Sequence, residues 1–271
     1  MANLIVSAKS GNDWGLNELK YFRIDFEIIH NFNEFFGINE PILTGVIDEI
    51  AKYPINIFEN ISNLLNTGSK DISKFIKHLI FATNIYSNNE TNVDTFAEHM
   101  LEMFEYDIGT NIIGMRAELN LDMCGIKVYT KPDVYLEDLS RKIKLLIQED
   151  KSYNVSSSMD FDLRITESQM VAEAIAAFQT NNRNRRNQGI PEENHVVFPC
   201  IIMLGTYPIF YLFEITKELA DNIMFGIYPK IDTIIKKYQI PSLIPYGNTL
   251  FDVNKRYKIF QCYTAFRNFI I

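Results

Sequence analysis

The sequence predicts an α/β protein: a small mixed sheet flanked by helices, with a largely helical N-terminal extension. Two short apolar runs, at residues 134–136 and 144–147, are typical of strands, and the polar segment 137–142 between them suits a tight connection. Segments with an apolar residue every three to four positions lie on both sides of these runs, as amphipathic helices require. The chain has 271 residues, 47% of them hydrophobic and 22% charged, so it can bury a sizeable core.

The predicted extension covers residues 1–90, and the predicted core covers residues 91–271. Within the extension, residues 23–29 alternate apolar and charged side chains, which favours a strand. Three later segments show the apolar spacing of a helix; they are residues 43–51, 57–65 and 72–82. No catalytic motif occurs before about residue 87, so the chemistry is expected in the core.

The core begins with a helix capped by Asp94 or Thr95. The elements expected after it are strands at 111–123 and 125–130, the two strands around 134–147, a helix that opens at Thr166, a polar loop at 181–194, and strands at 196–204 and 209–215. The remaining chain alternates helical stretches with proline and glycine breaks. Its aromatic-rich end, residues 251–271, is expected to pack on the core, although it could instead mediate assembly into a homo-oligomer.

Composition and cysteine usage indicate an intracellular protein, in the cytoplasm or the nucleus. Cys124, Cys200 and Cys262 are an odd number of widely spaced cysteines, which suggests neither a disulfide framework nor a structural zinc site. The N-terminus has a short apolar run with no basic region ahead of it, so it is a poor secretory signal. The uncharged stretch 196–213 is interrupted by Pro199 and Gly205 among other turn-forming residues, so we expect two buried strands there and no membrane span.

The most informative stretch places Asp133 directly after Pro132 and then, one hairpin later, Glu149 and Lys151 in a Glu-x-Lys arrangement. Side chains alternate along a strand, so Glu149 and Lys151 are expected on one face and Gln148 on the other. Two carboxylates supply hard oxygen ligands for Mg²⁺ or Mn²⁺, which also bind phosphate oxygens. A lysine beside such a cation can orient the attacking water or offset developing charge. The simplest alternative is a surface ion pair between Glu149 and Lys151.

These residues resemble the signature of the PD-(D/E)xK nuclease superfamily. The strings LLIQEDKSY and ESQMVAEAIAAFQ are more narrowly similar to a group of largely uncharacterised fungal proteins with that nuclease-like core. The resemblance covers roughly residues 94–215. It implies a restriction-endonuclease-like core and a nuclease that hydrolyses phosphodiester bonds of DNA or RNA with Mg²⁺ or Mn²⁺. In that interpretation Asp133 and Glu149 hold the metal and Lys151 acts beside it.

The same resemblance implies auxiliary residues on the two neighbouring helices. The helix before the sheet offers Glu98 as a further metal ligand, with Glu102, Glu105 or His99 as alternatives. The helix after Glu-x-Lys offers Gln169, with Glu173 one turn later. A plain interpretation of these last two is the polar stripe of an amphipathic helix.

A nucleic-acid partner requires basic residues, and two groups are candidates: the cluster Arg183, Arg185 and Arg186, and the residues around the hairpin, which are Lys127, Lys131, Arg141, Lys142 and Lys144. The plain alternative for each group is a solvated face or loop. The formal net charge of −8 argues against such a partner, because phosphate contacts usually supply much of the affinity. An alternative function is therefore a catalytically inactive nuclease-like scaffold that binds nucleic acid or a protein.

Other enzyme classes lack their usual signatures in this sequence. There is no glycine-rich phosphate loop ending in Gly-Lys-Ser/Thr, no Gly-x-Ser-x-Gly and no His-Glu-x-x-His. The four histidines are scattered, so a histidine-rich zinc site would need long-range assembly that the sequence does not indicate.

Overall fold

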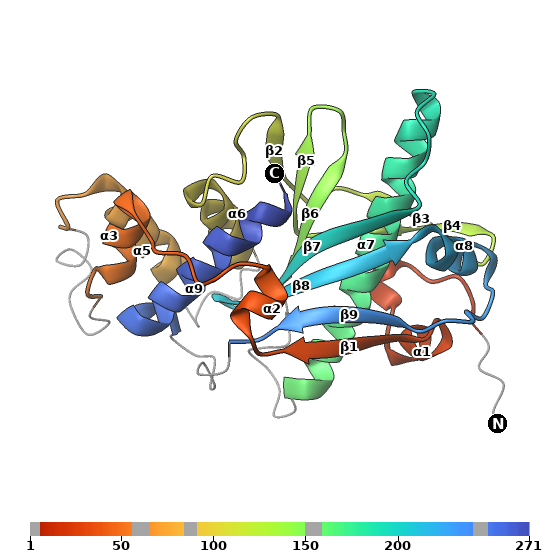
Figure 1. Ribbon diagram of the computed structural model, residues 1–271, viewed down its shortest axis with the longest axis horizontal. Coiled ribbons are helices and arrows are strands. Elements are labelled where there is room, and N and C mark those ends of the chain that lie inside the picture. Colours follow the sequence, from red (N-terminus) through yellow and green to blue (C-terminus); the bar gives the residue numbers. More distant parts are fainter. Residues whose placement is uncertain (1–5, 56–65, 84–90, 150–158, 241–248, 271) are drawn as a thin grey trace.

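The computed structural model describes residues 6–55, 66–83, 91–149, 159–240 and 249–270, and it has a central mixed sheet with helices on both faces (Figure 1). Within these residues the central sheet has seven strands, in the order β1-β9-β8-β7-β6-β5-β2. They are β1 (Ile24–Ile29), β2 (Asn111–Met115), β5 (Val134–Asp138), β6 (Ile143–Glu149), β7 (His195–Leu204), β8 (Tyr207–Thr216) and β9 (Thr233–Tyr238). A separate two-stranded sheet pairs β3 (Leu119–Met123) with β4 (Ile126–Thr130). The α/β class expected from the sequence is confirmed.

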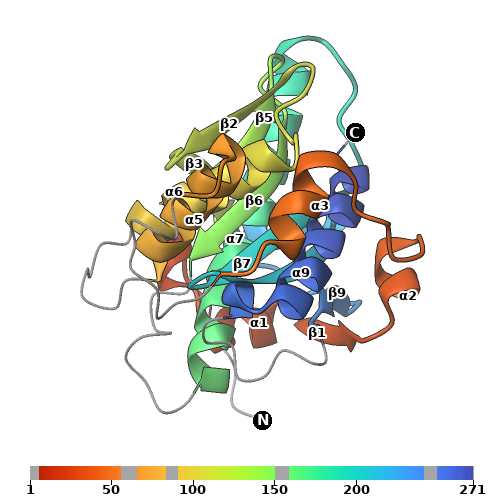
Figure 2. The same cartoon turned by 90° about the vertical axis from the view of Figure 1, so that its left-hand side faces the viewer.

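The helices connect and cover these strands. They are α1 (Leu16–Tyr21), α2 (Phe32–Phe36), α3 (Gly45–Lys52), α5 (Lys70–Ala82), α6 (Thr91–Met103), α7 (Met159–Asn187), α8 (Lys217–Phe225) and α9 (Val253–Phe266). Short 3-10 turns are η1 (Gly11–Asp13), η3 (Thr249–Phe251) and η4 (Arg267–Phe269). Figure 2 shows α5 and α6 side by side, in agreement with the contacts between them.

Strands β2, β5 and β6 form an antiparallel meander, and β7 then pairs parallel with β6 after the long crossover helix α7. Val134 lies opposite Ile147 in the β5–β6 pair, and the register shifts between Leu136 and Glu137. A parallel pair needs such a crossover, because the chain must return to the starting edge. The start of β5 and the end of β6 are therefore neighbours in the sheet.

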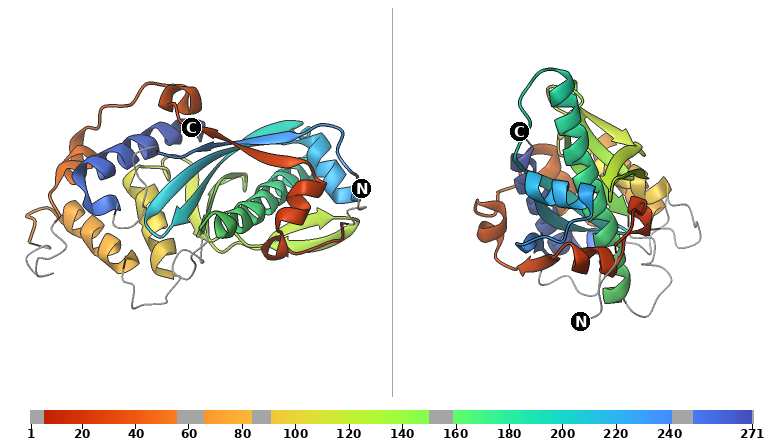
Figure 3. Two further views of the ribbon diagram at one scale, coloured as in Figure 1. Left: turned by 90° about the horizontal axis from the view of Figure 1, so that it is seen from below. Right: turned by 90° about the vertical axis from the view of Figure 1, so that its right-hand side faces the viewer.

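Helices α7 and α9 cover opposite faces of this sheet. Tyr211 and Phe210 are adjacent in β8, so their side chains point to opposite faces. The Tyr211 hydroxyl donates to Glu167 of α7 at 2.8 Å, whereas the Phe210 ring lies 5.0 Å from Phe266 of α9. The left view of Figure 3 shows α7 running along one side of the strands. The aromatic C-terminal segment packs on the core, as expected.

Helix α7 is enclosed because the small β3–β4 sheet covers the side that faces away from the central sheet. Ala172, Ala176 and Ala177 are fully buried, which is the close approach expected from their size. On the outer side, the Gln179 side chain accepts from the Asp122 backbone N–H of β3 at 2.8 Å and donates to its carbonyl at 3.1 Å. A helix between two sheets must bury nearly its whole circumference.

Buried Arg256 of α9 ties the N-terminal half of the chain to the C-terminal half. Its guanidinium donates to the carbonyl oxygens of Ala51 at 3.1 Å and Leu250 at 2.7 Å, and also to those of Tyr53 and Phe251. Burial lowers its pKa to about 10, and the nearby Asp252 carboxylate opposes that shift. The side chain therefore satisfies backbone acceptors that water cannot reach.

Several sequence-based expectations for the elements need correction. Helix α7 begins at Met159, well before Thr166, and ends at Asn187, so residues 181–187 belong to the helix and not to a loop. The strand expected over 111–123 is two strands, β2 and β3, in different sheets. Strand β9 was not expected. The strand expected at 23–29 is confirmed as β1, the helices at 43–51 and 72–82 are confirmed as α3 and α5, and the helix at 57–65 lies outside the described residues.

Candidate active site

Asp133 lies between β4 and β5, at the edge of the region where α7 and the small sheet meet the central sheet. The residue is 9% exposed, and its backbone carbonyl accepts from the Arg116 N–H at 3.0 Å. Arg116, with a φ of 57°, extends its guanidinium to the carboxylate of Asp94 in the first turn of α6, at 2.9 Å. A non-glycine residue with positive φ is uncommon and is often found at functional sites. Asp133 is thus held by contacts that reach back to α6.

Glu173 of α7 presents a fully buried carboxyl group beside Asp133. Among the described residues, neither of its oxygens has a hydrogen-bond partner. Burial raises the pKa of Glu173 well above its ordinary value, and the Asp133 carboxylate raises it further. The Thr130 hydroxyl at the end of β4 opposes this shift, but it is not aligned for a hydrogen bond to the Glu173 carboxyl group. Two acidic groups from different elements therefore share one enclosed environment.

The floor of this environment is the α7 face of β6 and β7. Cys200 of β7 pairs with Leu146, and its fully buried thiol has a raised pKa because of burial and the nearby Glu173. Gln148 shares this face by strand alternation, is 5% exposed, and has an Oε1 without a hydrogen-bond partner among the described residues. Buried polar atoms without partners are rare, so Gln148 on this face and Glu173 on the helix that covers it mark a site that can accept a ligand.

The backbone of Glu149 ends β6, opposite Met203 of β7, but the position of its side chain lies outside what the structure describes. Lys151 also lies outside the described residues. Their roles remain predictions. The end of β6 that carries them is next to the start of β5 that follows Asp133.

Gln169 lies one turn before Glu173 on α7. Its amide Nε2 donates to the Asn12 carbonyl of η1 at 2.9 Å. The neighbouring Gly11 packs so closely on Thr130 that a Cβ at position 11 would lie 2.2 Å from the Thr130 Oγ1. Gln169 therefore holds the N-terminal turn over the same region that contains Thr130 and Glu173.

The electrostatic neighbours of Glu98 lie at the contact between α6 and α5. Its pKa is raised by partial burial and by Glu102, and Lys74 of α5 opposes the shift. Glu102 in turn binds Lys74 at 3.0 Å. The acidic residue of α6 that is connected to the Asp133 backbone is Asp94, through Arg116.

His99 of α6 stacks on His78 of α5 with 4.4 Å between the ring centres. Within the described residues, neither of its ring nitrogens has a hydrogen-bond partner. Burial, then His78 and Lys74, lower the pKa of His99 to about 4, so the ring is neutral at physiological pH. The neighbours of His99 are His78 of α5 and Glu102 of α6, so it lies in the contact between these two helices.

The arginine cluster lies near the end of α7, and each of its members contacts an acidic residue. Arg183 binds Asp122 at 3.0 Å, and Arg186 binds Glu192 at 2.9 Å. Arg185 lies 3.5 Å from Glu193 and donates to the Pro191 carbonyl at 2.7 Å. Lys131 is exposed, two residues before Asp133.

The donor set fits a hard cation in part. Among the described residues, no group of three or more His, Cys, Asp or Glu side chains is placed to hold a metal ion. Asp133 and the unpartnered Glu173 provide two carboxylates, which is the chemistry that Mg²⁺ and Mn²⁺ prefer. Gln148 offers a further oxygen on the same face, whereas the sequence-based candidate Glu149 is expected on the opposite face by strand alternation.

No protein-family model matches the chain, and no curated protein matches it. Across the ranges that the structure covers, no helix combines the length and the apolar character that crossing a membrane requires.

The sequence patterns did not indicate that Thr130, Asp94 and Arg116 lie near Asp133, and they indicated Glu173 only as a neighbour of Gln169. Asp94 was interpreted as a helix cap, and Arg116 was assigned to a strand. A signal existed for Glu173: it lies among small apolar residues of α7, an unusual place for a solvent-facing carboxylate.

Proposed function

We propose that the chain is a divalent-metal-dependent nuclease that hydrolyses phosphodiester bonds of DNA or RNA on a restriction-endonuclease-like core. The observation that carries the proposal is the buried Glu173 carboxyl group, without a hydrogen-bond partner in the described structure, beside Asp133. A buried acid without a partner is costly and is concentrated at functional sites. A bound cation would remove that cost.

The topology supports the proposed core. Helix α6, the meander β2-β5-β6, crossover helix α7 and the parallel strand β7 follow one another in the order that the Pro132-Asp133 and Glu-x-Lys motifs imply. Asp133 precedes β5, and β6 ends at Glu149, so both acidic motif residues come from neighbouring strand ends.

The proposed roles follow from this arrangement. Asp133 and Glu173 would hold Mg²⁺ or Mn²⁺, which would bind phosphate oxygens and lower the pKa of a water molecule. Glu149 stays a sequence-based candidate ligand; because strand alternation expects it on the face opposite Gln148, it would join them only by turning round the end of β6. Lys151 orients that water or offsets charge on the phosphate. Gln169 positions the η1 turn over the site. Lys131 contacts the nucleic-acid backbone, and Glu98 remains an auxiliary candidate for a metal.

The test is cleavage of labelled single- and double-stranded DNA and RNA in Mn²⁺, Mg²⁺ or EDTA. Asp133→Asn, Glu173→Gln and Lys151→Ala are each expected to lower the metal-dependent rate by about 100-fold or more. Asp107→Asn and Glu49→Gln are matched controls, because both residues are exposed and carry the same chemical change. Cleavage that survives EDTA, or that Asp133→Asn leaves equal to Asp107→Asn, contradicts the proposal.

A second readout does not depend on activity. Because burial and Asp133 raise the pKa of Glu173, Mn²⁺ binding to it is expected to release a proton into a weakly buffered solution at any pH below that raised pKa. Glu173→Gln should abolish this release, and Glu49→Gln should preserve it. Calorimetry in two buffers of different ionisation enthalpy measures the proton.

The alternative function is a catalytically inactive scaffold that binds nucleic acid or a protein partner. It is favoured by the lack, among the described residues, of a group of three metal ligands. It predicts filter binding of nucleic acid that is indifferent to Lys151→Ala but is weakened in the triple alanine variant of Arg183, Arg185 and Arg186. Since these arginines already contact carboxylates, a partner must compete with those ion pairs.

A further inference from the structure

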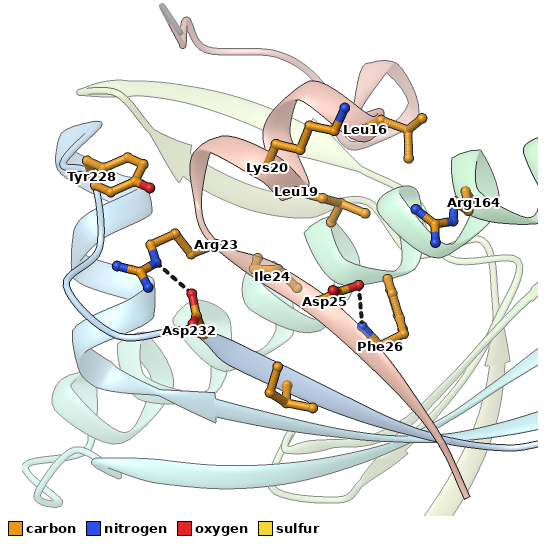
Figure 4. Close-up of a pocket in the computed structure, with 11 residues that line it drawn as sticks. Leu16, Leu19, Lys20, Arg23, Ile24, Asp25, Phe26, Arg164, Tyr228 and Asp232 are labelled. Carbon is orange, nitrogen blue, oxygen red and sulfur yellow. Dashed lines mark hydrogen bonds and ion pairs between the residues drawn. The ribbon is translucent and has the colours of Figure 1, made fainter. Parts of the chain in front are cut away.

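A cavity of about 590 Å³ lies at the β1 edge of the central sheet, between α1, β1, α7 and the loop that precedes β9 (Figure 4). This volume is in the range of pockets that hold small molecules. Leu19, Ile24 and Ile234 are among its apolar lining residues. The cavity is separate from Asp133 and Glu173, which are not among the residues that line it.

Basic side chains from three different segments meet at this cavity. Lys20 comes from the last turn of α1, Arg23 from the turn into β1, and Arg164 from α7. The acidic lining residues are Asp25 and Asp232, so the lining carries one positive charge in excess. A positive site is notable in a chain whose formal net charge is −8, because such a concave site attracts anions locally.

Arg23 is fixed in place by its surroundings. Its Nε lies 2.6 Å from Asp232, another guanidinium nitrogen donates to the Lys230 carbonyl at 3.0 Å, and the group lies 5.9 Å from the centre of the Tyr228 ring. The backbone of Arg23 has a φ of 54°, a conformation that an arginine adopts only when its surroundings enforce it. Tyr228 is itself held by the edge of Tyr21 at 5.7 Å.

Lys20 and Arg164 are exposed, and within the described structure neither makes a hydrogen bond or an ion pair through its side chain. Figure 4 shows both at the cavity, with Tyr228 and Arg23 further along it. The cavity therefore combines two cationic groups without ion pairs in the described structure, the aromatic residue Tyr228, which is 54% exposed, and the Asp25 carboxylate.

We propose that this cavity binds a nucleotide, either free or as the 5′-phosphorylated end of a nucleic acid. Lys20 and Arg164 bind the phosphate, since ammonium and guanidinium groups make strong charge-assisted hydrogen bonds to it. The planar base packs against Tyr228 and the apolar wall. Asp25 accepts a hydrogen bond from a sugar hydroxyl or a base amino group, which favours a nucleotide over inorganic phosphate.

The experiment is isothermal titration calorimetry of the full chain, in EDTA, with four probes: inorganic phosphate, adenosine, adenosine 5′-monophosphate and a 5′-phosphorylated trinucleotide. The variants are Lys20→Gln and Arg164→Gln. Lys77→Gln is the matched control, because Lys77 is exposed on α5, at the opposite end of the molecule from α1 (Figure 1). Circular dichroism melting confirms that each variant folds.

We expect saturable binding of a 5′-phosphorylated nucleoside probe that is tighter than binding of adenosine or phosphate. Lys20→Gln and Arg164→Gln should each weaken it by about tenfold or more, and Lys77→Gln should leave it unchanged. The tighter of the two phosphorylated probes identifies a free nucleotide or a nucleic-acid end as the ligand. The proposal is overturned if neither probe binds, if phosphate binds as tightly as both, or if folded Lys20→Gln and Arg164→Gln bind like Lys77→Gln.

Discussion

Replacing Glu173 by glutamine is expected to stabilise the metal-free fold by an amount that grows as the pH rises. Burial and the Asp133 carboxylate raise the pKa of Glu173 well above its ordinary value of 4.5. The folded chain therefore binds a proton that the unfolded chain releases above that value. Stability must then fall with rising pH between the unfolded and the folded pKa. Glutamine has nearly the same shape and no proton to lose.

The size of the effect follows from this linkage. Each pH unit in that window costs the wild type about 1.4 kcal/mol relative to the variant. Between pH 5 and pH 7, the advantage of Glu173→Gln should therefore increase by up to about 2.8 kcal/mol, twice that slope. Full burial of the carboxyl group makes solvent screening small.

The assay is urea denaturation at both pH values in EDTA, with Glu49→Gln as the control for removing one carboxylate from the surface. A glutamine advantage that is the same at pH 5 and pH 7 would refute the reasoning, because it would mean that the Glu173 pKa is not raised. A variant that is less stable at both pH values would show that the carboxyl group has a partner that it needs.

Two further predictions concern the buried side chains of His99 and Arg256. His99→Gln should make the stability of the fold less sensitive to acid. Burial, His78 and Lys74 lower the folded pKa of His99 to about 4, so the stability that the neutral ring contributes is present above pH 6.5 and is lost as the pH falls. Between pH 7 and pH 5, the free energy of unfolding measured in urea should fall by about 2 kcal/mol more for the wild type than for His99→Gln. His30→Gln, a change at an exposed histidine, is the control and should behave like the wild type. Arg256→Met should cost about 3 kcal/mol or more, since it leaves several buried carbonyls without a donor, while neighbouring Lys255→Met should change stability by less than about 0.5 kcal/mol; equal losses would contradict the role of Arg256.

Local sequence patterns predicted the strands whose pairing is also local. Residues 196–204 and 209–215 are rich in β-branched and aromatic residues around a turn, and they form the hairpin β7–β8. Gly205 adopts a φ of 58° in that turn. The β5–β6 pair was predictable for the same reason, because its connection is short.

Long-range contacts explain the elements that were not predicted. In β9, Lys236 and Lys237 obscure a strand pattern, yet Lys237 is 7% exposed and its Nζ lies 2.8 Å from Glu167 of α7. At the end of α7, the side chain of Asn181 bonds the Ile143 backbone N–H and carbonyl, each at 2.9 Å. These partners lie far away in the sequence, so local propensity favoured a loop.

The candidate site likewise combines residues that local patterns predict with residues that only long-range contacts bring together. The motif residue Asp133 was chosen from its chemistry, and the structure adds that Glu173 lies beside it. The neighbours of Glu173 come from both sheets, Cys200 from β7 and Thr130 from the end of β4, and no periodicity in α7 itself reveals them.

The pairing of β1 with β9 has a consequence for how the chain matures. Ile24 lies opposite Thr233, and these strands run parallel at one edge of the central sheet. During synthesis, residues 24–29 leave the ribosome long before their hydrogen-bonding partner exists, so this edge can form only late. Translation that stops before β9 would leave β1 unpaired, with its backbone groups and one apolar face open to aggregation. Strand β1 can therefore pair in the sheet only after β9 has been made.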